Sequence, residues 1–317
     1  ERQFTPEQVH EVKLVLRLLP MFLTTIGYWC CYSQMGTLFV SQGLQMRRRW
    51  GGFEIPAAAL SSIDTLAIIV LVPLYDALVP ALRRRLGWRI GQLERIGWGN
   101  LLAALTMLAA GIVEARRLAF FRAGRMAPGE DTSDRYAAVA LPIFWQGFQY
   151  ILVASSEVLA SIGQLELFYD QAPDSMRSCC SALQLLGSAL GSFLAGFIIQ
   201  GTNAASRRWG REWIPEDLNH GRLDLYFYLL AALMMANQFA YVLVAARFEF
   251  KKVAHGPQAA APGEGPDADS ARTPLLGGEA APPTTAPIGF SRRRNFVEQA
   301  RSLATQFLSP TLPSQLR

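Results

Sequence analysis

The chain has 317 residues, of which 51% are hydrophobic and only 17% are charged, against about 25% charged residues in soluble domains. The mean hydropathy is +0.18 although the stretch after Val253 is polar, so the apolar residues concentrate before that point. This composition excludes an ordinary soluble enzyme and predicts an integral membrane protein. The net charge of +5 does not predict a nucleic-acid partner, because the arginines stand in short runs between uncharged stretches, as loop residues beside membrane spans do.

Six long apolar segments follow one another along the chain. They cover residues 18–46, 55–82, 96–113, 137–169, 178–206 and 225–246. Five exceed the roughly 20 residues that a helix needs to cross a bilayer, and the third is marginal. Each is predicted to be a helix, because backbone groups in lipid must bond internally and none of the runs alternates like a barrel strand. Lys and Arg are equally frequent on the two sides, so the positive-inside rule gives no orientation.

The two ends of the chain are polar. Residues 1–13 are predicted to be a linker that precedes a six-helix unit over residues 14–250. Residues 251–317 are rich in Pro, Gly and Ala and are predicted to be mostly disordered. Within them, residues 291–308 fit a basic amphipathic helix on an anionic membrane surface, and a weakly helical tail without a docking site is the alternative. Because the chain starts with Glu1 and not with Met, we expect a fragment of a longer protein.

Motifs of soluble enzymes are missing from the sequence. All four cysteines fall inside apolar runs and are interpreted as small buried residues, while the three histidines lie outside those runs. This distribution predicts no metal site. The sequence contains no Walker loop, GxSxG, HExxH or paired-carboxylate motif, so an enzyme active site is not predicted.

Glu157 lies midway along the fourth apolar segment, where an ionised group costs roughly 2.5–3.5 kcal/mol on insertion scales. On a helix it shares one stripe with four other polar residues, namely Gln146, Tyr150, Ser161 and Gln164. Such a stripe facing lipid would be costly, so we expect it to line a cavity. There the carboxylate could bind a cation such as a substrate amine, or take up a proton. A structural carboxyl bonded to a neighbouring helix is the alternative.

Two more acids lie in the second segment. Asp64 has polar neighbours, and a position in a cavity wall and a packing hydrogen bond explain it equally well. Asp76 stands shortly before Arg83, Arg84 and Arg85, a pattern typical of a charge cluster at a helix end with a structural or gating role.

The first segment carries polar and aromatic residues at mid-span, where an interfacial belt explains them poorly. They are Tyr28, Trp29, Tyr32, Ser33, Gln34 and Thr37. The wall of a binding pocket fits this pattern, and ordinary helix packing is the alternative.

The remaining features of the spans are interpreted as architecture. Glu166 and Asp170 could reach the membrane interface or pair with Arg177. Gly187 and Gly191 are spaced so that another helix can approach closely.

Four motifs in chain order resemble those of the proton-dependent oligopeptide transporters. Residues 19–35 (LPMF, YW, YSQM) are similar to their seventh helix and residues 72–87 (VPLYD, RRRLG) to the eighth helix and the loop after it. Residues 157–178 (EVLASIGQLELFYDQAPDSMRS) resemble the tenth-helix motif, and residues 225–230 (LYFYLL) the start of the twelfth. The opening FTPEQVHEVK and the position of Asp64 resemble the peptide/histidine branch of solute carrier family 15.

The resemblance covers residues 4–250 and implies two three-helix repeats that form the C-terminal half of a major facilitator fold. It implies that Glu157 contacts the amino terminus of the substrate, that Trp29 lines the pocket, and that Asp64 stands where many relatives have Asn. The charged loop of the family, matched by Asp76 and the three arginines, implies that both chain ends face the cytosol.

We therefore predict an all-α membrane protein with six transmembrane helices and a disordered tail. The full-length protein is predicted to be a secondary active transporter and not an enzyme: a proton-coupled symporter of di- and tripeptides, and of free histidine. Its predicted substrate-binding residues are Glu157, Trp29, Asp64, Tyr28, Ser33 and Ser161. Alternatives are a transporter of another amine or an anion on the same fold, and a non-transporting membrane adaptor or truncated product.

The predicted partners are the substrate, protons as the coupling ion, the lipid bilayer and an N-terminal six-helix half. That half would carry the ExxER motif that couples protons in the family. No cofactor, metal or nucleic acid is predicted. The resemblance implies an endosomal or lysosomal membrane, with the plasma membrane as the alternative.

Overall fold

The computed structural model describes residues 5–86, 91–127, 137–172, 177–208, 210 and 212–248. The α-helices in these residues are α1 (Pro6–Tyr32), α2 (Leu38–Leu44), α3 (Ser61–Leu86), α4 (Gln92–Arg122), α5 (Gly147–Leu159), α6 (Ser161–Gln171), α7 (Arg177–Arg207) and α8 (Leu223–Arg247). The predicted tail, with the helix proposed at residues 291–308, lies outside the described residues. Helix α1 begins at Pro6, inside the segment 1–13 that was predicted to be a linker.

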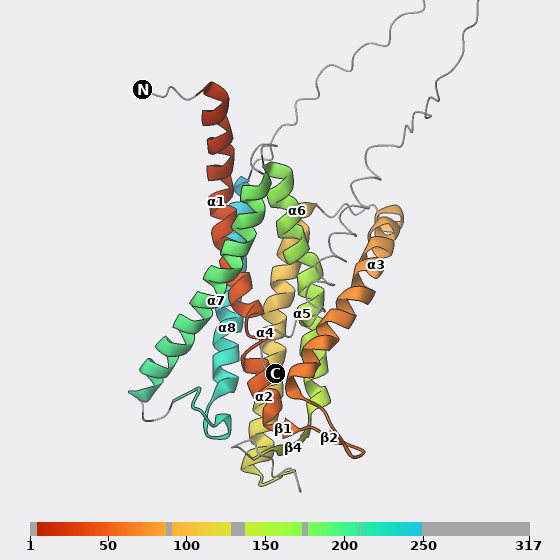
Figure 1. Cartoon of the computed structure of the whole chain (residues 1–317), viewed down its shortest axis with the longest axis vertical. Coiled ribbons are helices and arrows are strands. Elements are labelled where there is room, and N and C mark those ends of the chain that lie inside the picture. Colours follow the sequence, from red (N-terminus) through yellow and green to blue (C-terminus); the bar gives the residue numbers. More distant parts are fainter. Residues whose placement is uncertain are drawn as a thin grey trace, which may run out of the picture. The chain divides into compact units, whose positions relative to one another are not determined.

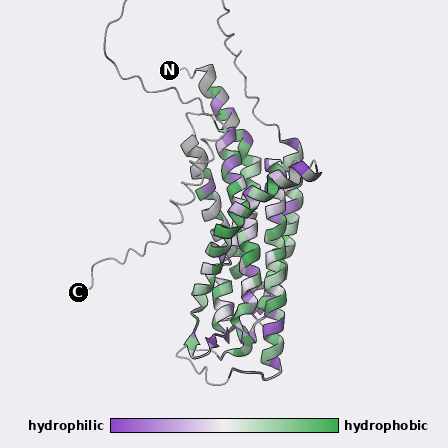
Figure 2. Cartoon of the chain, turned by 90° about the vertical axis from the view of Figure 1, so that its right-hand side faces the viewer, coloured by the Kyte–Doolittle hydropathy of each residue, from purple (hydrophilic) through white to green (hydrophobic). Residues whose placement is uncertain are grey.

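Six stretches of the described chain are long and apolar enough to cross a membrane. They are Glu11–Tyr32, Ala57–Pro80, Gln92–Arg122, Ile143–Gln171, Ser181–Arg207 and Leu223–Arg247. Figure 2 shows hydrophobic residues along the length of the helices, with hydrophilic residues more frequent toward the two ends. The prediction of six spanning helices is confirmed. The third span is longer than predicted and includes Glu114 and Arg117.

Short strands lie at the end of the bundle opposite to the start of α1 (Figure 1). Strand β1 (Met46–Arg47) pairs in parallel with β4 (Val139–Pro142), and β2 (Arg49–Trp50) forms a hairpin with β3 (Phe53–Glu54). The hairpin turns at Gly51 and Gly52, whose φ values of 57° and 91° favour glycine. Residues 139–142 are therefore extended, although they fall in a segment that was predicted to be helical.

Two of the apolar segments contain more than one helix, whereas each was predicted to be a single helix. In the first segment a break at residues 33–37 separates α1 from α2. There the Ser33 hydroxyl and the Gln34 amide both donate to the Cys30 carbonyl, at 2.9 and 3.0 Å, and the Thr37 hydroxyl donates to the Ser33 carbonyl at 3.1 Å. Side chains that bond nearby carbonyls compete with helical hydrogen bonds, which explains why the helix stops here.

In the fourth segment α5 and α6 meet at Ala160. The φ and ψ of this residue, −85° and −56°, stay helical, and the backbone hydrogen bonds from Ala160 to Ser156 and from Gln164 to Ala160 are kept. Gly99 of α4 packs directly against Ala160, because a Cβ atom built on Gly99 would lie only 2.4 Å from the Ala160 nitrogen. The fourth span is therefore nearly continuous, and α4 approaches it closely at Ala160.

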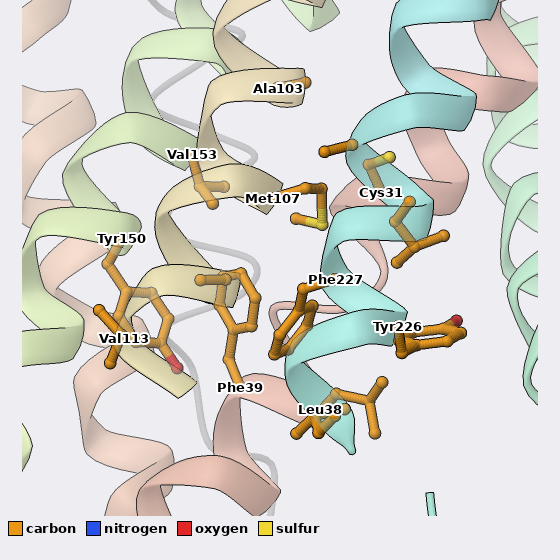
Figure 3. Packing of buried hydrophobic residues seen from close by; sticks show 14 of the residues in the cluster. Cys31, Leu38, Phe39, Ala103, Met107, Val113, Tyr150, Val153, Tyr226 and Phe227 are labelled. Atoms are coloured by element: carbon orange, nitrogen blue, oxygen red, sulfur yellow. The ribbon is translucent and has the colours of Figure 1, made fainter. Parts of the chain in front are cut away.

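The apolar core lies between α1, α2, α4, α5 and α8 (Figure 3). Phe39 of α2 is fully buried and contacts the rings of Tyr150 and Phe227 edge-on, with centroid distances of 5.8 and 5.6 Å. Helices α3 and α7 border this core, to which α7 contributes Ala195, and they expose large apolar side chains such as Ile69 and Phe193. Those faces suit lipid or another helical unit.

Helix α7 approaches α1 through its small residues, as its sequence pattern predicted. A Cβ atom on Gly191 would lie 2.5 Å from the Cβ atom of Trp29 and 2.8 Å from the Cys30 nitrogen. A Cβ atom on Gly187 would lie 3.2 Å from the Thr25 hydroxyl oxygen and 3.4 Å from the Phe22 ring, both in α1. The two backbones are therefore in contact, which only glycine permits at this spacing.

Replacing Gly191 by Ala is expected to destabilise the protein by about 1–3 kcal/mol, because the added methyl group overpacks the contact between α1 and α7. Thermal unfolding of the purified full-length protein in detergent measures the effect as a lower Tm. The matched control is Gly196→Ala on the same helix, where a Cβ atom meets nothing within 4 Å. Equal Tm values for the two variants would refute the packing role of Gly191.

Candidate functional site

Five side chains from three helices form an acidic cluster inside the bundle. Tyr28 and Tyr32 come from α1, Asp64 from α3, and Tyr150 and Glu157 from α5. The two tyrosines of α1 are one turn apart and precede the break at residues 33–37. Asp64 is in the first turn of α3, a helix that packs against α5. The fold thus brings together residues from the first, second and fourth spans.

The members of the acidic cluster interact with one another. The Tyr32 hydroxyl lies within hydrogen-bonding reach of the Glu157 carboxyl group. The carboxyl group of Asp64 lies within electrostatic range of Glu157 and of the Tyr150 hydroxyl. Tyr28 lies within range of both carboxyl groups. The sequence predicted Glu157, Asp64 and Tyr28 as site residues, and the structure places all three in one cluster.

Several polar atoms of the cluster are buried and have no hydrogen-bond partner within the described chain. They are Tyr28 Oη, Asp64 Oδ1, Tyr150 Oη and Glu157 Oε2. Asp64 is 4% exposed, Tyr28 and Tyr150 are fully buried, and Glu157 is half-buried. Buried polar atoms in native proteins are normally paired with protein or with ordered water, so these four atoms leave hydrogen-bonding capacity that water or another molecule can fill.

Trp29 lies beside the cluster. Its ring contacts those of Tyr28 and Tyr32 edge-on, at centroid distances of 5.5 and 5.3 Å, and its indole nitrogen has no partner among the described residues. The same side chain packs against Gly187 and Gly191 of α7. Trp29 therefore serves both as an aromatic wall of the site and as part of the contact between α1 and α7.

Two predicted site residues make hydrogen bonds outside the acidic cluster. The Ser33 hydroxyl bonds to the Cys30 carbonyl and takes part in the break between α1 and α2. Ser161 is buried next to Ala160, and its backbone carbonyl accepts a hydrogen bond from Gln184 at 3.4 Å. The sequence predicted Ser33 as part of a pocket wall with the aromatic residues of the first segment, and Ser161 as part of the same helical stripe as Glu157.

The predicted polar stripe around Glu157 is divided by tertiary contacts. Gln146 donates to the Phe39 carbonyl and to the Gln42 amide oxygen, both at 2.8 Å, and belongs to a different cluster. Gln164 is a buried residue of α6, and neither its amide nitrogen nor its amide oxygen has a hydrogen-bond partner in the described structure. Of the stripe, Tyr150 and Glu157 belong to the acidic cluster.

The predicted charge cluster lies at the end of α3. This helix continues to Leu86, so the three arginines stand on its last turns and not in a loop. Asp76 and Arg84 are both exposed, and the Arg84 guanidinium donates to the Pro80 carbonyl at 3.4 Å. The side chains of Arg83 and Arg85 lie outside the described part of the structure. The gating role of these residues stays a prediction.

A buried ion pair that the sequence analysis did not single out lies in the third span. Arg117 and Glu114 are both fully buried and joined by two hydrogen bonds, at 2.6 and 2.9 Å. Arg117 also donates to Gln45 at 3.0 Å and Asn219 at 2.5 Å, and Gln42 of α2 donates to Glu114 at 2.9 Å. The pair thus connects α4, α2 and the loop before α8. Its signal in the sequence is Glu and Arg three residues apart at the end of an apolar run.

A second ion pair joins α4 to α6. Arg95 bonds to Glu166, and Gln92 donates to Asp170 at 2.8 Å. The two acids were expected to reach the interface or to pair with Arg177, but among the described side chains their partners come from α4. Residues distant in sequence supply these partners, so spacing could not reveal them.

Neither carboxyl group of the acidic cluster forms an ion pair with a described residue. No group of three or more His, Cys, Asp or Glu side chains that could hold a metal ion occurs among the residues described. Carboxyl groups that lack a cation at this depth can be neutral by protonation or can accept an organic cation.

Six stretches of the described chain are long and apolar enough to span a membrane, and buried polar groups lie among their helices. The family model described as "PTR2: POT family" matches residues 2–214. The chain belongs to the POT family.

Two curated relatives come from Arabidopsis thaliana. "Protein NRT1/ PTR FAMILY 8.2" is 43% identical over 253 residues, which covers 78% of this chain and 43% of the relative. "Protein NRT1/ PTR FAMILY 8.3" is 42% identical over 255 residues, which covers 79% of this chain and 43% of the relative. The chain therefore spans less than half the length of these relatives.

A solved structure has the same fold. The crystal structure of an auto-inhibited POT family peptide transporter matches with a TM-score of 0.63 at 22% sequence identity. The match covers 79% of this chain and 44% of that protein. The prediction of a six-helix half of a transporter fold is confirmed.

Proposed function

We propose that the complete protein is a proton-coupled symporter of di- and tripeptides, and that this chain supplies one of its two six-helix halves. The observation that carries the proposal is Glu157, a carboxyl group midway along a span with one buried oxygen unpartnered and a second carboxyl group, Asp64, nearby. The family membership of the chain and the length of its relatives support the same reading.

The physical argument concerns the charge of Glu157. An ionised carboxyl group inside a membrane is costly unless it is neutralised. A proton neutralises it in one state, and the ammonium group of a peptide neutralises it in another. The peptide and the proton cannot occupy Glu157 together, so the arriving ammonium group displaces the proton. Symport then requires a second acceptor that carries the proton together with the bound peptide, a role for Asp64 or for the N-terminal half. The Tyr32 hydroxyl lies within hydrogen-bonding reach of the Glu157 carboxyl group.

Transport between the two halves needs a driving force. Each positive charge that crosses gains about 2.3 kcal/mol per 100 mV of membrane potential. One pH unit across the membrane adds about 1.4 kcal/mol per proton. Either gradient is sufficient for about a tenfold accumulation of substrate.

Several finer assignments belong to the same proposal. They are free histidine as a further substrate, the peptide/histidine branch of solute carrier family 15, an endosomal or lysosomal membrane, and both chain ends in the cytosol. Their support is the sequence motifs alone, since the named relatives are plant NRT1/PTR proteins. The N-terminal half with the ExxER motif belongs with them.

The test is uptake by the full-length protein in proteoliposomes with an acidic exterior. Labelled Ala-Ala is expected to accumulate inside, and a protonophore is expected to abolish the accumulation. Unlabelled dipeptide and histidine are expected to compete, and nitrate is expected not to. Accumulation of nitrate without dipeptide would instead support an anion transporter, and no uptake of either would support the adaptor alternative.

A further inference from the structure

Asp64 gives the acidic cluster a second carboxyl group in addition to Glu157. Asp64 is 4% exposed, and its Oδ1 atom has no hydrogen-bond partner in the described chain. The Oε2 atom of Glu157 is likewise buried and unpartnered. Helices α3 and α5, which carry the two acids, pack against each other, and the two carboxyl groups are close enough to repel each other when both are ionised.

The other described groups that face the two acids carry no positive charge. They are the hydroxyl groups of Tyr28, Tyr32 and Tyr150, which come from α1 and α5. The hydroxyl groups of Tyr28 and Tyr150 are themselves buried and unpartnered. The two acids are therefore accompanied by hydrogen-bonding groups that suit a cationic guest and do not compete with it for charge.

The buried or partly buried arginines of the described spans are already neutralised elsewhere. Arg117 is paired with Glu114, and Arg95 is paired with Glu166. A zwitterionic peptide brings one ammonium group, which can neutralise one acid of the cluster. The second acid then needs either a proton or a second positive charge.

We propose that Asp64 is a specificity-determining residue that makes this site favour substrates with two positive groups: an α-ammonium group held by Glu157 and a basic side chain held by Asp64. The inference rests on the proposed function and names the substrate class of the same site. A peptide with Lys at its first position carries both groups within one residue. A neutral peptide of the same size leaves Asp64 to be satisfied by a proton.

The experiment compares Lys-Ala with norleucine-Ala. Norleucine has the same four-carbon side chain as lysine but lacks the ε-ammonium group at its end. Both compete with labelled Ala-Ala for uptake by the full-length protein in proteoliposomes. Lys-Ala is expected to inhibit at about tenfold lower concentration, which corresponds to about 1.4 kcal/mol. Equal inhibition by the two peptides would overturn the inference without any variant, while Ala-Ala uptake would still support the proposed function.

Two variants test the residue itself. Asp64→Asn keeps the size of the side chain but removes its charge and replaces one acceptor oxygen by an NH2 donor, so Lys-Ala and norleucine-Ala are expected to inhibit the remaining Ala-Ala uptake equally. Asp64→Glu keeps the charge and is expected to keep the preference. A preference that survives in an active Asp64→Asn protein would contradict the proposal. If the Asp64→Asn protein does not fold, the proposal is tested by two other results: the preference of the wild-type protein for Lys-Ala over norleucine-Ala, and the retention of that preference in the Asp64→Glu protein.

Discussion

Replacing Glu157 by Gln in the full-length protein is expected to abolish proton-driven uptake of dipeptides while membrane insertion stays intact. The amide has nearly the same shape but can neither bind a proton at the position of the carboxylate nor hold an ammonium group by charge. The loss is expected to exceed a hundredfold, because both the ion and the substrate lose their partner. Uptake of labelled Ala-Ala into proteoliposomes measures it.

Two further variants make this result specific. Tyr32→Phe removes a hydroxyl group that lies within hydrogen-bonding reach of Glu157 and is expected to weaken uptake about tenfold without abolishing it, as a hydrogen bond to a charged group contributes about 1.5–3 kcal/mol. Glu54→Gln changes an exposed acid paired with Arg48 at 3.1 Å in the β2–β3 hairpin and is expected to leave uptake unchanged. Near-normal uptake by the Glu157→Gln protein would refute its place at the centre of the site.

Replacing Arg117 by Met is expected to cause the largest loss of stability in the described chain. The change leaves Glu114 buried and without its cation, and such a break costs about 3–5 kcal/mol. The hydrogen bonds from Arg117 to Gln45 and Asn219 are lost at the same time. The expected result is a large fall in the monodisperse fraction and the Tm of the full-length protein in detergent.

The double variant Glu114→Gln with Arg117→Met separates charge from packing. It removes both charges together, so it is expected to recover part of the Tm that Arg117→Met loses. The matched control is Arg84→Met, an exposed arginine whose loss is expected to change the Tm little. A double variant that is less stable than Arg117→Met alone would show that the unpaired charge of Glu114 is not the cause.

Much of the fold follows from local properties of the sequence. The six spans were predictable because apolar length and the need for internal backbone hydrogen bonds act within each segment. Glu157 was predictable for the same reason, since a carboxyl group in a span stands out against its own neighbours. The contact of Gly191 with α1 followed from the spacing of small residues on a single helix.

Contacts between segments could not be predicted in this way. The break at residues 33–37 comes from side chains that bond nearby carbonyls, and α5 meets α6 at Ala160, where Gly99 of α4 approaches closely. From hydropathy alone, the third span was predicted to end before Glu114. In the structure Glu114 pairs with Arg117, and this pairing makes the burial of both charges possible.

The order of the apolar runs thus determined that this chain crosses the membrane six times, and the isolated acid determined where to look for a binding site. Only the tertiary structure decided that Asp64, Tyr32 and Tyr150 meet Glu157, and which arginines are already neutralised. The reason is physical: the cost of burying one charge depends on its own position, whereas its neutralisation depends on groups that folding brings from elsewhere in the chain.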